Sequence, residues 1–199
     1  SGEVPIVGHM VIDRSDYIMF TGSTAVGRMV AARCGERLIG ASMELGGKNA
    51  MIVRADVDPE VAASIAVRAS FANSGQLCIS MERIYVHENV YQEFLDAFAR
   101  RTTALRLSAH VGWGAEVGSL ISEKQAARVQ EHVDQAVAQG AVVHAGGKRR
   151  PDIGPYFFEP TILTGVNDSM TLCTQETFGP VVAVYPVSSD AEAIERAND

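Results

Sequence analysis

The sequence lacks the clustered positive charge that binding to nucleic acid requires. It holds 17 lysine and arginine residues against 24 acidic ones, for a net charge of −7, and its longest basic run is Lys148-Arg149-Arg150. Affinity for phosphate backbones depends on grouped Lys and Arg side chains. We therefore expect no nucleic-acid partner.

Hydrophobic segments long enough for a membrane are also missing. No uncharged apolar stretch approaches the roughly 20 residues that cross a bilayer. The residues after Ser1 do not show the basic flank and apolar centre of a signal peptide. We expect a soluble, cytoplasmic protein with no membrane partner.

Cysteine is scarce. Cys34, Cys78 and Cys173 lie at wide, irregular spacing, and none belongs to a Cys-x-x-Cys pair. This pattern argues against a disulfide scaffold and against a zinc site, so we expect reduced thiols and no bound metal.

Hydrophobic strands alternate with helices along the chain. Strands are predicted at 17–20, 50–53, 83–86, 141–144 and 181–187, and helices from Val26 to Leu38, over 59–72, 91–107 and 123–138, and after an N-cap at Asp190. Because the strands are continuously hydrophobic, they favour an α/β fold with mainly parallel sheets. We expect the chain to begin just before a strand and to end inside a helix, as a segment of a longer protein would.

A glycine turn joins the first strand to the first helix. In Gly22-Ser23-Thr24-Ala25-Val26-Gly27, free backbone N–H groups and the positive end of a helix dipole would face outward and could hold a phosphate. The same turn is also an ordinary strand-to-helix connection, and it does not match Gly-x-Gly-x-x-Gly. Both interpretations stay open.

Glu44 and Cys78 are the residues best placed for catalysis. Glu44 precedes Leu45-Gly46-Gly47, where glycines let a substrate or cofactor approach the backbone closely, so it could act as a general base. Cys78 follows the turn formers 73–76, on a connection where a thiol could be exposed and backbone N–H groups could stabilise an oxyanion. The plainer alternatives are a solvated carboxylate at a strand end and a small buried thiol, which is how we interpret Cys34 and Cys173.

An acid and an aromatic residue stand two positions apart near the C-terminus, in Gln175-Glu176-Thr177-Phe178-Gly179-Pro180. Glu176 could accept hydrogen bonds from ribose hydroxyls while Phe178 packs against a flat ring. A turn acid beside a core aromatic residue is an equally ordinary explanation.

Taken together, four segments resemble the aldehyde dehydrogenase superfamily in order and approximate spacing. They are Phe20-Thr21-Gly22-Ser23-Thr24, Glu44-Leu45-Gly46-Gly47-Lys48, Gly75-Gln76-x-Cys78 and Glu176-x-Phe178-Gly179-Pro180. The resemblance implies the end of a Rossmann-like nucleotide-binding domain over residues 1–46 and most of an α/β catalytic domain over residues 47–199. It covers the chain essentially from end to end.

The resemblance also implies a role for each candidate residue. Cys78 would be the nucleophile and Glu44 the base that activates water. Gly22, Ser23 and Leu45 would bind the cofactor, NAD or NADP, with Ser23 contacting its phosphates. Glu176 would bind the nicotinamide ribose, and Phe178 would pack near the nicotinamide.

Substrate and assembly follow from the same resemblance. Residues 75–83 and 121–124 look most like succinate-semialdehyde dehydrogenases, so a small aldehyde of that kind is the expected partner, and the whole protein is expected to be a homo-oligomer.

The sequence departs from the family's pattern at two places. The family's upstream Asn motif for the oxyanion has no match here, and Ser119 stands where the family often has proline. We expect the whole enzyme to be active and this segment alone to be inactive.

Three rivals remain. A CoA-acylating aldehyde dehydrogenase would need no water-activating carboxylate, which the setting of Glu44 argues against. A truncated, non-catalytic binding or oligomerisation module is compatible with the sequence. A thiol hydrolase would need a histidine partner for the cysteine, and none of the five histidines lies in a recognisable partner motif.

Overall fold

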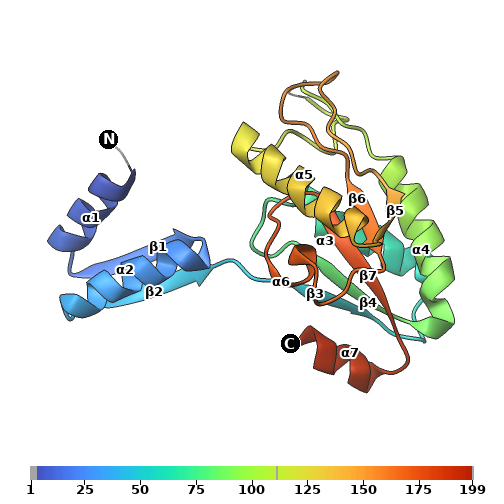
Figure 1. Cartoon of the computed structure of the whole chain (residues 1–199), viewed down its shortest axis with the longest axis horizontal. Coiled ribbons are helices and arrows are strands. Elements are labelled where there is room, and N and C mark those ends of the chain that lie inside the picture. Colours follow the sequence, from blue (N-terminus) through green and yellow to red (C-terminus); the bar gives the residue numbers. More distant parts are fainter. Residues whose placement is uncertain (1–3, 111, 199) are drawn as a thin grey trace. The chain divides into compact units, whose positions relative to one another are not determined.

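The computed structural model describes residues 4–110 and 112–198. The chain divides into two compact units, Ser1–Gly47 and Lys48–Asp199 (Figure 1). Each has a sheet and a hydrophobic core of its own.

The first unit is a two-stranded parallel sheet with two helices. Its elements are α1 (Val4–Arg14), β1 (Tyr17–Gly22), α2 (Thr24–Glu36) and β2 (Gly40–Leu45). The strands run in register from Tyr17 opposite Gly40 to Gly22 opposite Leu45. As the sequence predicts, a helix follows the glycine turn, and the Ser23 hydroxyl caps it by accepting a hydrogen bond from the Val26 N–H.

Two expectations for this unit are wrong. The helix α1 precedes β1, although the chain was expected to begin just before a strand. Its short apolar runs, interrupted by Gly8, do not distinguish a helix from a strand without their tertiary neighbours. Leu38 lies outside α2, because the helix ends at Glu36 and Leu38 adopts a left-handed conformation with φ of 56°. Its side chain is 94% exposed.

The second unit is built on a five-stranded sheet. Its elements are β3 (Ala50–Val53), α3 (Pro59–Phe71), the short 3-10 helix η1 (Ala72–Gly75), β4 (Arg83–His87), α4 (Glu88–Thr103), α5 (Glu123–Ala138), β5 (Val142–Ala145), β6 (Thr161–Thr164), α6 (Thr171–Thr174), β7 (Val181–Val187) and α7 (Asp190–Ala197). The strand order is β3-β4-β7-β6-β5, and only β5 pairs antiparallel. The predicted α/β fold with mainly parallel sheets is confirmed.

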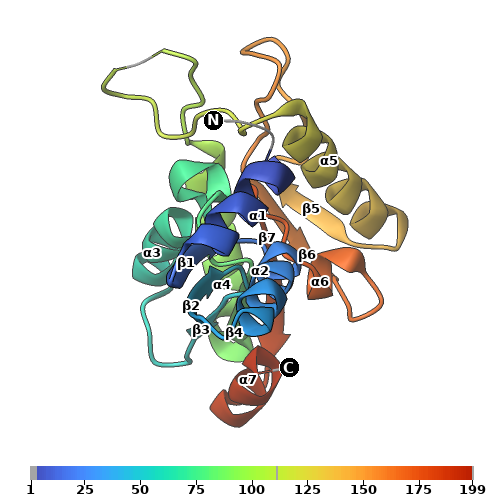
Figure 2. The ribbon, with the colours of Figure 1, turned by 90° about the vertical axis from the view of Figure 1, so that its left-hand side faces the viewer.

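Helices cover both faces of this sheet, which explains why β7 and the middle of β4 are hydrophobic on both faces. Along β4, Ile84 and Val86 pack in the cluster with α3 and α4, whereas Tyr85 packs in the cluster with α5. Figure 2 shows α3 and α5 on opposite sides of the sheet. A strand buried on both faces loses the alternation of a half-exposed one.

Most predicted boundaries agree with the structure, and the differences have local causes. The helix 123–138 and the strand 181–187 match α5 and β7, whereas the predicted helix 91–107 is α4, Glu88–Thr103. Ser189, not Asp190, caps α7, because the Ser189 hydroxyl accepts the Glu192 N–H. The short elements β2, β6 and α6 were not predicted.

Candidate active site

Cys78 lies on a tight turn between η1 and β4, and its side chain is exposed. The Ser80 N–H donates to the Leu77 carbonyl at 3.0 Å and closes the turn. The Asn49 amide donates to the Cys78 carbonyl at 2.6 Å and to the Ser80 carbonyl at 3.0 Å. The turn therefore presents the thiol outward while Asn49 fixes its backbone.

The residues before Cys78 are held in an uncommon backbone conformation. Asn73, Ser74 and Gly75 have φ of 51°, 57° and 69°, in the left-handed region that non-glycine residues rarely adopt. The Ser74 hydroxyl donates to the Gly118 carbonyl at 2.9 Å, and the Gln76 amide oxygen accepts from the Ile121 N–H at 2.9 Å. Such conformations persist where surrounding bonds hold them, and they gather at functional sites.

Gly75 brings the cysteine loop into contact with the segment after Phe178. A Cβ added at Gly75 would lie 2.1 Å from the Gly179 carbonyl oxygen, a backbone atom that cannot rotate away. Glycine at this position therefore allows the two loops to pack directly on each other.

Gly75→Ala is expected to destabilise this unit. The left-handed φ alone costs about 1–3 kcal/mol for a residue with a side chain, and the overlap with Gly179 adds to that cost. Thermal unfolding followed by circular dichroism should show a lowered Tm. Gly118→Ala is the matched control, because a Cβ there meets nothing within 4 Å. Equal Tm values for the two variants would contradict the assigned packing.

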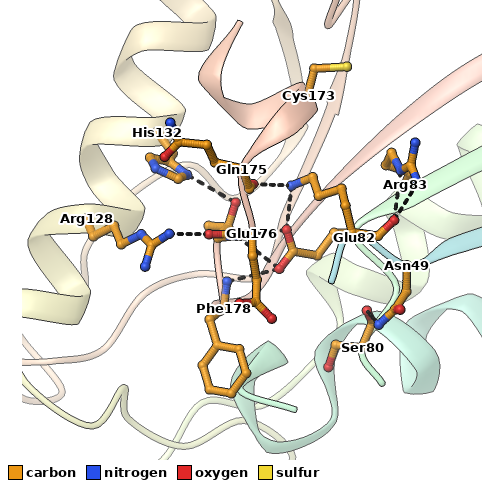
Figure 3. Close-up of polar contacts among 12 residues, drawn as sticks. Asn49, Ser80, Glu82, Arg83, Arg128, His132, Cys173, Gln175, Glu176 and Phe178 are labelled. Carbon is orange, nitrogen blue, oxygen red and sulfur yellow. Dashed lines mark hydrogen bonds and ion pairs between the residues drawn. The ribbon is translucent and has the colours of Figure 1, made fainter. Parts of the chain in front are cut away.

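The loop that contains Glu176 and Phe178 is held from both sides by side chains (Figure 3). The Glu82 carboxylate accepts the Thr177 N–H at 2.9 Å and the Phe178 N–H at 3.0 Å. The remaining contacts are Lys48 Nζ to the Gln175 carbonyl at 2.8 Å, Arg128 to the Glu176 carbonyl at 2.5 Å, and Gln125 to the Thr177 and Phe178 carbonyls at 2.8 and 2.7 Å. The side chains of Glu176 and Phe178 remain partly exposed at the surface of this framework.

Charges beneath this loop are compensated. Lys48 forms an ion pair with Glu82 at 2.5 Å, and their side chains are 11% and 5% exposed. Burial lowers the pKa of Lys48, whereas the carboxylate beside it favours the charged ammonium. His132 shares a hydrogen bond of 3.2 Å with the Thr177 hydroxyl. Burial, followed by the positive charges of Arg128 and Lys48, lowers the pKa of His132 and favours its neutral form.

The other predicted residues meet at the carboxyl end of the two-stranded sheet in the first unit. Glu44 is opposite Thr21, and Leu45 is opposite Gly22. Glu44 is exposed, and Leu45 packs against Gly27, where an added Cβ would lie 2.5 Å from the Leu45 side chain. At the α2 N-terminus the Ser23 hydroxyl oxygen accepts the capping bond, so its proton can still be donated to an anion.

The structure thus gathers the predicted site residues into two groups. Gly22, Ser23, Glu44 and Leu45 share one sheet end in the first unit, and Cys78, Glu176 and Phe178 lie on two neighbouring loops of the second. Cys34 is 2% exposed in a hydrophobic cluster, and Cys173 packs against another, as their packing interpretation predicts. No group of metal-ligating side chains occurs in residues 4–110 and 112–198.

Sequence reasoning missed the residues that position these loops. Asn49, Glu82, Gln125 and Arg128 act through partners that are distant in sequence, between 29 and 96 positions away for Asn49 and Glu82. One signal was present: Glu82-Arg83 places two charges at the entrance to a buried strand, and buried charges need partners.

Among the helices of residues 4–110 and 112–198, none combines the length and the apolar character needed to cross a bilayer.

Comparison with known proteins gives a consistent result over the chain. The model of the aldehyde dehydrogenase family matches residues 3–199. A Mycolicibacterium smegmatis protein with the provisional name succinate-semialdehyde dehydrogenase [NADP(+)] is 57% identical over the whole chain, which covers 38% of that protein. The 3-sulfolactaldehyde dehydrogenase of Priestia aryabhattai is 40% identical, and the chain covers 41% of it.

Two solved structures of dehydrogenases also resemble the chain. The succinate-semialdehyde dehydrogenase of Burkholderia pseudomallei superposes with a TM-score of 0.95 at 36% identity, over the whole chain and 42% of that protein. The NAD+ complex of a Bacillus cereus aldehyde dehydrogenase superposes with a TM-score of 0.94 at 38% identity, over the whole chain and 40% of that protein. The chain spans about two fifths of the length of its relatives.

Proposed function

The chain belongs to the aldehyde dehydrogenase family, and on that premise we propose that the whole enzyme containing it oxidises an aldehyde to a carboxylic acid with NAD+ or NADP+. Residues 1–46 are assigned to the end of its nucleotide-binding domain and residues 47–199 to its catalytic domain. One observation carries the proposal: the exposed Cys78 thiol stands on a fixed loop that packs, at Gly75, against the segment following Phe178.

The residues present fit a dinucleotide cofactor. The α2 N-terminus, with Gly22 and Ser23, offers outward N–H groups and a hydroxyl for phosphate, and Leu45 lies beside it. Glu176 supplies an acceptor for ribose hydroxyls, and Phe178 supplies an aromatic face. When bound, the nicotinamide accepts hydride.

Cys78 performs the first chemical step in this proposal. Its thiolate attacks the aldehyde carbon and forms a tetrahedral thiohemiacetal, which becomes a thioester after loss of hydride. The exposed turn leaves room for a substrate at the sulfur, and in this proposal the Cys78 N–H donates to the developing oxyanion. Asn49 supports this geometry because it fixes the carbonyls on both sides of Ile79.

Glu44 completes the turnover. It accepts a proton from water, and the resulting hydroxide attacks the thioester to release the acid. Its exposure at the end of β2, next to Leu45, leaves it accessible to water and near the proposed cofactor-binding residues.

We assign the substrate to small aldehydes that carry an anionic group at their far end. The relatives named above support this assignment, because succinate semialdehyde bears a carboxylate and 3-sulfolactaldehyde bears a sulfonate. We also assign the whole enzyme a homo-oligomeric state, as its family resemblance implies.

The function is tested by following nicotinamide absorbance with the whole enzyme. Succinate semialdehyde, a sulfonated aldehyde and an uncharged aldehyde of similar length would be compared, each with NAD+ and NADP+ and with or without coenzyme A. We expect acid formation without coenzyme A and a higher kcat/KM for the anionic aldehydes. Turnover only with coenzyme A would support the acylating rival, and no reduction of either cofactor would refute the proposal.

A further inference from the structure

Glu82 is a buried carboxylate that the proposed chemistry does not use. It stands four residues after Cys78, and its side chain is 5% exposed. Its two oxygens accept hydrogen bonds from the Thr177 N–H at 2.9 and 3.1 Å, from the Phe178 N–H at 3.0 Å and from Lys48 at 2.5 Å. All of these donors lie far from Glu82 in sequence, and two of them belong to the loop of Glu176 and Phe178.

The backbone of Glu82 is itself anchored in the sheet. Its N–H donates to the Asn49 carbonyl at 3.1 Å, and its carbonyl accepts the Ala183 N–H at 3.0 Å. The same Asn49 holds the Cys78 carbonyl through its side chain. Residues 78–82 therefore form a short stretch that is anchored at two points. It carries the Cys78 thiol at one end and, at the other, the Glu82 carboxylate that supports the Glu176–Phe178 loop.

Stability alone explains this arrangement poorly. Removing two charges from water costs free energy that their attraction often fails to recover, so a buried ion pair is weak support for a fold. What the carboxylate does supply is fixed geometry. Phe178 has φ of 55°, a strained value for a residue with a side chain, and the bond from its N–H to Glu82 holds that conformation (Figure 3).

We propose that Glu82 is a positioning residue for hydride transfer, because its carboxylate fixes the Glu176–Phe178 loop relative to Cys78. This rests on the proposed function. In the step concerned, the C–H bond of the thiohemiacetal breaks, and its electron pair leaves with the hydrogen as hydride. NAD(P)+ is reduced, and the alkoxide oxygen forms the thioester carbonyl. The distance from carbon to acceptor decides the rate of this step, and a displacement of about 1 Å can cost about 100-fold.

The test uses Glu82→Ala and Glu82→Gln in the whole enzyme. For Glu82→Ala we expect kcat to fall about 100-fold, with the KM for aldehyde and cofactor within about threefold of the wild type. The kinetic isotope effect with aldehyde deuterated at the carbonyl carbon should rise, because hydride transfer becomes rate-limiting. Glu82→Gln keeps one acceptor oxygen, so its kcat should fall by only about 10-fold. Its isotope effect should rise as in Glu82→Ala.

Two controls separate positioning from general damage. Alkylation of Cys78 by iodoacetamide should proceed at the wild-type rate in both Glu82 variants, since the cysteine turn keeps its own bonds. Glu60→Gln removes a carboxylate that pairs with Arg100 and Arg101 away from this loop, and it should leave kcat and the isotope effect unchanged.

The outcomes are distinct. Unchanged kcat and isotope effect in Glu82→Ala would overturn the proposal, and so would a parallel loss of alkylation and turnover, which indicates a structural role. If Glu82→Ala does not fold, the isotope effect of Glu82→Gln is the test. A raised isotope effect supports the proposal, and an unchanged one overturns it. Failure of the wild-type enzyme to oxidise any aldehyde would refute the proposed function instead.

Discussion

Replacing Cys78 with serine in the whole enzyme is expected to lower kcat on the order of 10⁴-fold or more, because a serine hydroxyl cannot form the thioester that the proposed route requires. Loss of a covalent nucleophile removes the whole pathway that depends on it, and effects of this size are typical. The measurement is the initial rate of nicotinamide reduction with the best aldehyde of the panel. Cofactor affinity, measured by titration of protein fluorescence, should stay within about threefold, since the proposed cofactor contacts lie on other residues.

Cys173→Ser is the matched control for this experiment. Cys173 packs against a hydrophobic cluster, and burial raises the pKa of its thiol, which disfavours the reactive thiolate. Its replacement should keep turnover within a few-fold of the wild type. If Cys78→Ser retains turnover and Cys173→Ser loses it, the nucleophile has been assigned to the wrong sulfur.

Glu44→Gln is expected to separate the two halves of the reaction. The thioester should still form, giving a burst of about one equivalent of reduced nicotinamide per site, and steady turnover should then fall by about 10²- to 10⁴-fold, the usual contribution of a general base. Rapid-mixing absorbance measures both phases. Glu36→Gln, at the exposed end of α2, is a control that should change neither.

The shape of that time course discriminates between roles for Glu44. Loss of the burst together with the steady phase would show that Glu44 acts on the Cys78 thiol before the first step. Full turnover in the variant would remove Glu44 from the mechanism. If added coenzyme A restores turnover in Glu44→Gln, the thioester forms normally and only its hydrolysis needs the carboxylate.

Local sequence signals predicted much of the second unit. The apolar spacing of Val129, Val133 and Val137 defines α5, and the hydrophobic run Val181–Val187 defines β7. The turn formers before Cys78 correctly predict a connection between regular elements. These features depend on residues close together in the chain, which is why they could be identified without coordinates.

Other features were outside the reach of local signals. Helix α1 has no pattern that separates it from a strand, and Leu38 continues an apparent helical spacing although its backbone has left the helix. The short strands β2 and β6 carry too few residues for a periodic signal. The assignment of β2 depends on its pairing with β1, and the assignment of β6 depends on its pairing with β5 and β7.

Local spacing and composition account for the α/β class, the position of Cys78 on a loop and the motifs that place the chain in its family. How the cysteine loop and the Glu176–Phe178 loop are held depends instead on long-range contacts of the folded chain. Glu82 bonds with Phe178 across 96 positions, and Lys48 with Gln175 across 127. Such contacts arise when the strands of a parallel sheet bring distant segments together, and burial then makes each polar group find a partner.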